Sequence, residues 1–166
     1  MSGPSEPIRM EVRGLMLDPS SNTPIVILRD KKNEVFLPIW IGIFEANAIA
    51  LRIEGVEPPR PMTHDLLYAS LQELGAVVEK VTITELKENT FYARISLQYD
   101  STMISLDSRP SDALALALRA DAPIFVLRSV LESAKAVDLA GKLPDEERLK
   151  KWLEEVDPED LGKYKM

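Results

Sequence analysis

The segment from Ala113 to Leu118 alternates alanine with leucine, so a helix built from it is apolar on every side. Such a helix is stable in water only when it is buried, and its small alanines favour close packing. The chain has 166 residues. A domain of about this length buries roughly 68–70% of its unfolded surface, which is enough to enclose such a helix. We therefore expect one domain with a substantial core and a short extension.

The rest of the chain mixes strand and helix patterns without strict alternation. Alternating or apolar runs predict strands, and apolar stretches that end at Gly55 and Gly75 predict helices. The expected strands cover residues 8–12, 24–28, 34–41, 77–86, 91–99, 103–107 and 124–127, and the expected helices cover 43–54, 63–74, 111–119 and 129–137. Pro38 cannot donate to a ladder, so its strand should lie at an edge or carry a bulge. This order predicts an α+β fold with a large mixed β-sheet and helices packed on it.

The C-terminal segment has its own pattern. Pro144 precedes an acidic stretch, residues 145–156, with apolar residues at the i, i+3, i+4, i+7 spacing of an amphipathic helix. These apolar residues are Leu149, Trp152, Leu153 and Val156. We expect residues 1–140 to form the domain. Residues 141–166 should form an acidic helical extension that docks on the domain, on a second subunit or on a partner.

Composition narrows the classes of function. The chain carries 20 basic and 27 acidic residues, a net charge of −7, which argues against broad, non-specific binding to nucleic acid or anionic membrane but allows a local basic patch. It has no cysteine and one histidine, which excludes disulfides, thiolate metal sites and multi-histidine metal sites within one chain. No apolar run reaches the roughly 20 residues of a membrane helix, and the first residues lack a signal-peptide core. The expected compartment is the cytoplasm.

Two expected helix starts share an Arg-Pro pair, a hydroxyl residue and an aspartate. They run from Arg60 to Asp65 and from Arg109 to Asp112. The hydroxyl residues, Thr63 and Ser111, are expected N-caps. The two aspartates then fall in the first helical turn, where a carboxylate suits the helix dipole. Helix capping alone can explain this pattern, so a catalytic interpretation must rest on the neighbouring residues.

Those neighbours are ionisable. His64 titrates near neutral pH and could act as a general base on water, although a structural hydrogen-bonding role is the alternative. Arg60 and Arg109 could each grip a phosphate through the planar guanidinium, but Arg109 could instead pair internally with Asp107 or Asp112. We predict that the two Arg-Pro segments lie together. His64 or Asp65 should then lie within hydrogen-bond reach of the cluster formed by Asp107, Arg109 and Asp112.

Glu45 interrupts an apolar stretch, and a carboxylate in such a place must be paired, exposed or functional. It should face the same cluster or pair with Arg52, seven residues further along the helix. Four carboxylates could hold one or two Mg²⁺ or Mn²⁺ ions through their oxygens, namely Glu45, Asp65, Asp107 and Asp112. No glycine-rich phosphate loop or nucleotide fingerprint is present.

Several motifs in series resemble the bifunctional nuclease domain family. They are the run from Leu37 to Gly42 followed by Glu45, the run from Arg60 to Leu66, the run from Asp107 to Ala113, and the run from Ala122 to Val126. The match spans about Ile8 to Val137 in the expected order. The resemblance implies an α+β fold with a large mixed sheet, a tendency to form homodimers, and an ability of some members to degrade RNA and DNA. It implies no settled set of catalytic residues.

Two functional hypotheses follow. The first is a nuclease, metal-assisted, that hydrolyses phosphodiester bonds of RNA or DNA. Its candidate catalytic residues are His64, Asp65, Asp107 and Asp112, and its candidate substrate-binding residues are Arg60 and Arg109. The second is a non-catalytic regulatory or scaffold module that binds an anionic ligand or a protein partner. The acidic net charge and the absence of a recognised catalytic motif favour the second hypothesis, and the family resemblance favours the first.

Overall fold

One mixed β-sheet forms the body of the structure, a computed structural model that describes residues 3–30, 32, 35–134 and 137–138. Its strand order is β6-β5-β4-β7-β1-β2-β3-β8. The strands are β1 (Pro7–Leu17), β2 (Pro24–Asp30), β3 (Val35–Trp40), β4 (Val77–Lys87), β5 (Thr90–Tyr99), β6 (Thr102–Ser108), β7 (Ile124–Leu127) and β8 (Val137–Asp138). Neighbouring strands are antiparallel except β4 and β7, which are parallel. The predicted α+β fold with a mixed sheet is confirmed.

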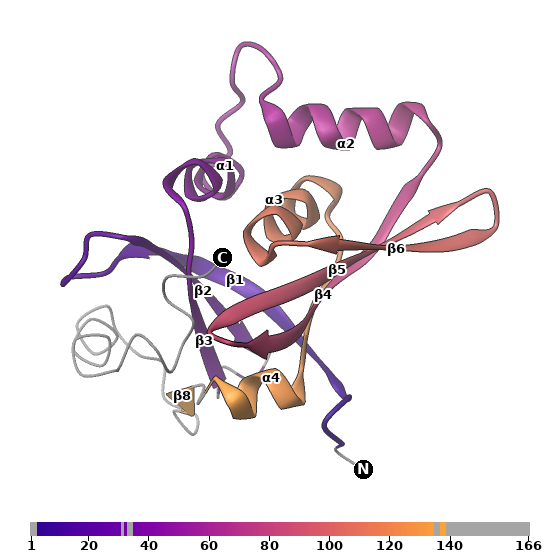
Figure 1. Ribbon diagram of the computed structural model, residues 1–166. Helices are drawn as coiled ribbons and strands as arrows, with labels where there is room; N and C mark the ends of the chain where they lie inside the picture. The colour runs from indigo at the N-terminus through magenta and orange to yellow at the C-terminus, as the bar shows by residue number, and fades with distance from the viewer. Residues whose placement is uncertain (1–2, 31, 33–34, 135–136, 139–166) are drawn as a thin grey trace.

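Four helices pack on this sheet, α1 (Ile43–Ile53), α2 (Thr63–Glu73), α3 (Pro110–Ala120) and α4 (Arg128–Ser133). The first three cover one face and α4 lies on the other (Figure 1). The predicted helix 129–137 is too long, because α4 ends at Ser133 and Val137 belongs to β8. The predicted C-terminal helix lies outside the described residues. None of the helices in the described part of the chain is long and apolar enough to cross a membrane.

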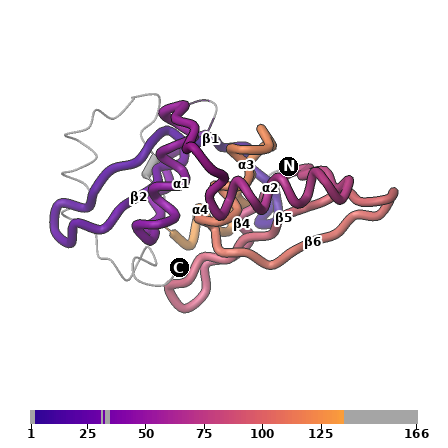
Figure 2. Tube along the Cα trace, turned by 90° about the horizontal axis from the view of Figure 1, so that it is seen from above, coloured from indigo at the N-terminus to yellow at the C-terminus, as the bar shows by residue number. Residues whose placement is uncertain are grey.

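The Ala-Leu helix is α3, and it lies where the sequence requires. Residues 113–117 are all buried, because α3 packs against α1 and α2 on one side and against β4 and β5 on the other. Viewed from above, α1 lies over the β2 side of the sheet and α2 extends toward β5 and β6 (Figure 2). No residue of α2 is buried, so this helix is the outer layer of the domain. The prediction of a buried helix is confirmed.

The β2–β3 hairpin contains the predicted edge residue Pro38, and the turn before the hairpin is bonded to the core. Pro38 lies opposite Ile27 of β2, and the short β8 pairs only with Val35 and Phe36. Within the described residues no strand therefore lies beside Pro38 on the outer side of β3, which agrees with the predicted edge position. The turn that precedes β2 contains a buried carboxylate, Asp18, which accepts a hydrogen bond of 2.7 Å from the Trp40 indole Nε1. This bond ties the turn to the core.

Candidate active site

The N-terminal turns of α1, α2 and α3 meet above the sheet and place four ionisable side chains together. Glu45 is the third residue of α1, His64 the second of α2 and Asp112 the third of α3, while Arg109 is the N-cap of α3. We call this group the His64 cluster. The predicted N-caps Thr63 and Ser111 are wrong, because Met62 and Arg109 hold the cap positions. The aspartates nevertheless lie in the first turn, as predicted.

A continuous chain of hydrogen bonds runs through the His64 cluster. The Nε2 atom of His64 lies 2.8 Å from Oδ1 of Asp112. The second oxygen, Oδ2, accepts from Nε of Arg109 at 2.9 Å, and Nη2 of Arg109 lies 2.8 Å from the same oxygen as an ion pair. The same Nη2 donates to Oε1 of Glu45 at 2.6 Å. The predicted proximity of the two Arg-Pro segments is therefore confirmed, as is the prediction that Glu45 faces their cluster.

Gly42 is part of this arrangement. A Cβ atom at this position would collide with the carboxylate of Glu45. A glycine N-cap therefore leaves the space that Glu45 needs to turn back toward the start of α1 and reach Arg109. Side-chain packing thus explains why a glycine stands three residues before Glu45.

The electrostatics favour the ionised forms of Asp112 and Arg109. The pKa of Asp112 is lowered, because the hydrogen bond from His64 and those from Arg109 outweigh the effect of burial. Burial alone would lower the pKa of Arg109, but its hydrogen bonds to Asp112 and Glu45 raise it. With neutral His64, one guanidinium faces two carboxylates, so the formal charge of the cluster is +1 − 2 = −1. Arg109 is thus compensated internally and is a weaker phosphate ligand than the sequence suggested.

A second ion pair fixes α2 beside the cluster. Nε of Arg119 donates to Oδ1 of Asp65 at 2.6 Å, and the other Asp65 oxygen accepts from the backbone N–H of Met62 at 3.0 Å. Arg119 also donates to the carbonyls of Ala115 at 2.9 Å and Ala48 at 3.1 Å. The pKa of Asp65 is lowered, first by the Met62 N–H and then by Arg119, against the opposing effect of burial. Asp65 is therefore an anchor between helices and is not free to act as a base.

Arg119, whose side chain is only 3% exposed, was not among the residues predicted from the sequence. A signal was present, because an arginine at the end of an otherwise apolar helix needs a carboxylate partner when it is buried. The choice of Asp65 as that partner depends on how α2 packs on α3. That packing is not visible in a single sequence.

Two predicted site residues lie outside the cluster. Asp107 is exposed near the end of β6, opposite Arg94 of β5. Arg60 is exposed in the loop between α1 and α2. In the described part of the chain, neither side chain forms a hydrogen bond or ion pair with the His64 cluster. Asp107 therefore shares no hydrogen bond or ion pair with Arg109 or Asp112 among the described residues, and its role in the site stays a prediction.

The carboxylates predicted as metal ligands do not fit a metal ion in this arrangement. Glu45 and Asp112 are bonded to Arg109, Asp65 is bonded to Arg119, and Asp107 lies apart. Among the described residues, no three His, Cys, Asp or Glu side chains are grouped closely enough to hold a metal. A carboxylate that already neutralises a guanidinium must lose that partner before it can bind a cation. No chemical step is therefore assigned to a metal.

The chain is similar to several known proteins. A family model for the bifunctional nuclease domain matches residues 26–138. An uncharacterised protein of Mycobacterium tuberculosis is 40% identical over 161 residues, which is 92% of this chain and 96% of that protein. A bifunctional nuclease of Oryza sativa, subspecies japonica, is 28% identical over 116 residues, 68% of this chain and 35% of that protein. A bifunctional nuclease of Arabidopsis thaliana is 25% identical over 116 residues, 68% of this chain and 36% of that protein.

Proposed function

This chain belongs to the bifunctional nuclease domain family, and we propose that it hydrolyses phosphodiester bonds of RNA or DNA at the His64 cluster. The observation that carries the proposal is the 2.8 Å contact between Nε2 of His64 and Oδ1 of Asp112. A carboxylate that holds one imidazole nitrogen selects the tautomer and leaves the other nitrogen to exchange a proton. The plant relatives named as nucleases support the reaction class.

The proposed reaction uses His64 as a proton carrier. With neutral His64 donating its Nε2–H to Asp112, Nδ1 has a free lone pair and accepts a proton from the attacking water. The water oxygen bonds to phosphorus while the bond from phosphorus to the leaving oxygen breaks. The imidazolium then gives its proton to that leaving oxygen. Asp112 stabilises the imidazolium and keeps the ring oriented, and both Asp112 oxygens are occupied, which restricts its own movement.

Arg109 and Glu45 support this dyad. Arg109 contacts one Asp112 oxygen through two of its nitrogens, and Glu45 holds the guanidinium from the other side. The Arg109 side chain is still 49% exposed, so its outward N–H groups can reach a phosphate oxygen of a bound substrate. In this proposal Arg109 acts mainly by positioning Asp112 and secondarily by contacting the substrate. Asp65 and Asp107 take no part in proton transfer.

The activity test uses labelled single-stranded RNA and DNA with purified protein, in separate reactions with Mg²⁺, with Mn²⁺ and with EDTA. His64→Ala and Asp112→Asn should each slow cleavage by about 10²–10⁴-fold, the usual contribution of a positioned acid or base. Glu132→Gln is the matched control, because Glu132 is exposed on α4, on the opposite face of the sheet. The metal and EDTA reactions also test the predicted metal dependence. Equal activity in all three variants would reject the site.

A non-catalytic module remains the second candidate, and one observation favours it. Each side chain of the His64 cluster is bonded to another member of the cluster, as in a polar network that only joins three helices. In that case no cleavage occurs in any metal or in EDTA. His64→Ala would then lower the melting temperature, and neither the wild type nor the variant would cleave the substrate.

We also propose that the protein forms a homodimer through the outer layer of the domain. Leu66 of α2 is 60% exposed, Leu74 at the C-cap of α2 is 70% exposed, and Met103 of the neighbouring β6 is 57% exposed. Exposed apolar side chains gathered on one side commonly mark an interface, and most oligomers are symmetric pairs. Leu66→Glu with Leu74→Glu should shift the sedimentation coefficient to that of a monomer. An unchanged coefficient would contradict this interface.

A further inference from the structure

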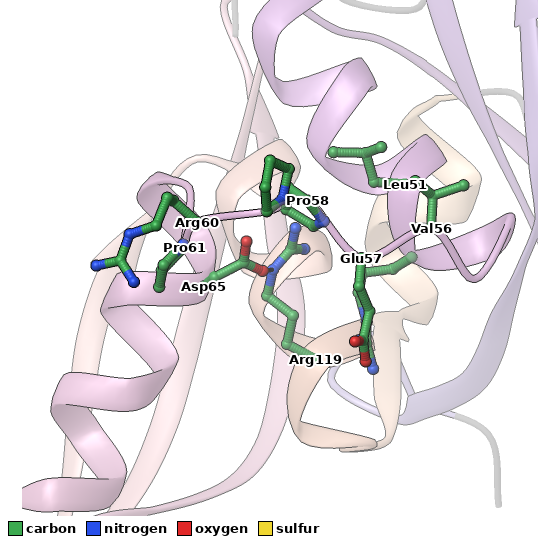
Figure 3. Close-up of a pocket in the computed structure, with 10 residues that line it drawn as sticks. Leu51, Val56, Glu57, Pro58, Arg60, Pro61, Asp65 and Arg119 are labelled. Carbon is green, nitrogen blue, oxygen red and sulfur yellow. Dashed lines mark hydrogen bonds and ion pairs between the residues drawn. The ribbon is translucent and has the colours of Figure 1, made fainter.

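A hollow of about 260 Å³ lies beside the His64 cluster, between the end of α1, the loop before α2 and the end of α3 (Figure 3). Asp65 and Arg119 meet inside it, and Asp65 directly follows His64 in α2. Its wall is formed largely by the proline-rich loop that ends at Pro61. We call this hollow the arginine pocket, because Arg52, Arg60 and Arg119 all line it.

The charge of the arginine pocket is positive in a chain of net charge −7. Three arginines and two acidic residues, Glu57 and Asp65, line the pocket, so the formal sum is +3 − 2 = +1. Arg119 is satisfied by Asp65. Arg52 and Arg60, by contrast, form no ion pair with any carboxylate in the part of the chain that the structure describes. Arg52 acts on Asp65 only through its charge, which contributes to the lowered pKa of Asp65, and Asp65 already holds Arg119. Arg52 and Arg60 can therefore attract an anion at the opening.

The loop that carries Arg60 is stiff. Pro59 precedes Arg60 and Pro61 follows it, and a proline fixes its own backbone while restricting the residue before it. The Arg60 side chain extends outward from the rim, whereas Arg119 and Asp65 point toward each other within the hollow (Figure 3). A rigid backbone lowers the entropy cost of binding, and an exposed side chain reorients within nanoseconds. The Arg60 side chain therefore has to turn inward to contact a ligand, while the loop backbone stays in place.

The size of the pocket selects the kind of ligand. A volume of about 260 Å³ lies below the roughly 300–1,000 Å³ of sites for drug-sized molecules, so it suits a small group such as a phosphate with part of its sugar. Planar guanidinium groups bind phosphate oxygens in a bidentate manner. The pocket also supplies positive charge that the His64 cluster lacks, since Arg109 is compensated by two carboxylates.

We propose that the arginine pocket binds an internal phosphate of a single-stranded nucleic acid, next to the bond that the His64 cluster cleaves. Arg52 and Arg60 contact the phosphate oxygens, and Arg119, held by Asp65, forms the floor. The position of the pocket relative to the scissile bond rests on the proposed function, but its binding of the strand does not. A substrate held at two places, the pocket and the His64 cluster, is oriented for attack at one bond.

Binding is measured by fluorescence anisotropy with the full chain carrying His64→Ala, so that the strand stays intact. The probe is a labelled single-stranded oligodeoxynucleotide. Adding Arg52→Gln and Arg60→Gln together should weaken binding by about tenfold or more, since a hydrogen bond to a charged group contributes about 1.5–3 kcal/mol. The slope of log K against log salt should become shallower by about 0.7 for each phosphate that the variant no longer neutralises. Arg9→Gln is the control, because Arg9 is exposed on β1 outside the pocket.

Equal affinity of the double variant and the Arg9→Gln control would overturn the proposal. Circular dichroism should show unchanged folds, because Arg52 and Arg60 are exposed. Equal binding of 5′-phosphorylated and 5′-hydroxyl strands is expected, and a clear preference for the phosphorylated strand would overturn the internal site in favour of a terminal phosphate. Loss of binding in the double variant, together with a wild-type protein that cleaves nothing, would support the pocket and reject the nuclease. Cleavage by the wild type, together with unchanged binding in the double variant, would support the nuclease and reject the pocket.

Discussion

Replacing Arg119 with methionine tests how the first turn of α2 is held in place. The Arg119 side chain is 3% exposed and donates to Asp65, Ala115 and Ala48. Removing one partner of a buried ion pair costs about 3–5 kcal/mol. Asp65 is 24% exposed and keeps the Met62 N–H, so the lower end of this range applies, about 3 kcal/mol. Methionine retains most of the apolar stem, so the change in packing adds little.

The assay is urea denaturation followed by circular dichroism, with thermal melting alongside. A loss of about 3 kcal/mol corresponds to a drop of about 6–12 °C in the melting temperature for a chain of this size. The control is Arg128→Met, because the Arg128–Glu6 pair has side chains 36% and 37% exposed. An exposed pair contributes about 0–1 kcal/mol. If Arg119→Met costs no more than Arg128→Met, the view of Arg119 as the anchor of α2 is refuted.

Three further predictions concern Asp107, Gly42 and Asp65. Asp107→Asn should leave the cleavage rate within about twofold of wild type, since Asp107 lies outside the His64 cluster, and a 10²-fold loss in the nuclease assay would return it to the site. Gly42→Ala should displace the Glu45 carboxylate, the end of a flexible side chain, and cost about 1 kcal/mol in urea denaturation by weakening its bond to Arg109, whereas an unchanged midpoint would show that Glu45 has room to move. The folded-state pKa of Asp65 is depressed, so its contribution to stability is complete above the usual value of 3.8 and is lost as the pH falls through the folded pKa. Asp65→Asn should therefore make the free energy of unfolding depend less on pH in the acidic range. An unchanged pH dependence would contradict the lowered pKa of Asp65.

Much of the fold could be predicted because its signals are local. The Ala-Leu alternation of α3, the glycines after α1 and α2, and Pro38 on β3 each reflect the chemistry of one segment. Gly55 and Gly75 have φ values of +69° and +81°, a conformation that glycine adopts without strain. The N-cap of α3 lies two positions before the predicted Ser111, because Pro110 occupies the first helical position and Arg109 precedes it, and the N-cap of α2 lies one position before the predicted Thr63.

The candidate site was predicted only in part, because its partners are chosen by packing between distant segments. Arg109 had Asp107 and Asp112 nearby in the sequence, yet its second partner is Glu45, 64 residues away. The sequence left Glu45 two possible positions, facing this cluster or pairing with Arg52, and the packing of α1 on α3 decides between them. Packing between helices also decides the pairing of Arg119 with Asp65, 54 residues apart. The cytoplasmic location and the docking of the C-terminal helix stay predictions.

In the proposed reaction His64 transfers the proton during phosphodiester cleavage, and chemical rescue is the decisive test of that step. The measurement is the cleavage rate of the His64→Ala variant on a labelled single-stranded substrate as free imidazole is added at constant pH. We predict a rate about 10²–10⁴-fold below wild type that rises with imidazole concentration. The Asp112→Asn variant, which retains its own histidine, should show no such rise. A His64→Ala variant that cleaves at the wild-type rate, or that imidazole fails to restore, would rule out this role for His64.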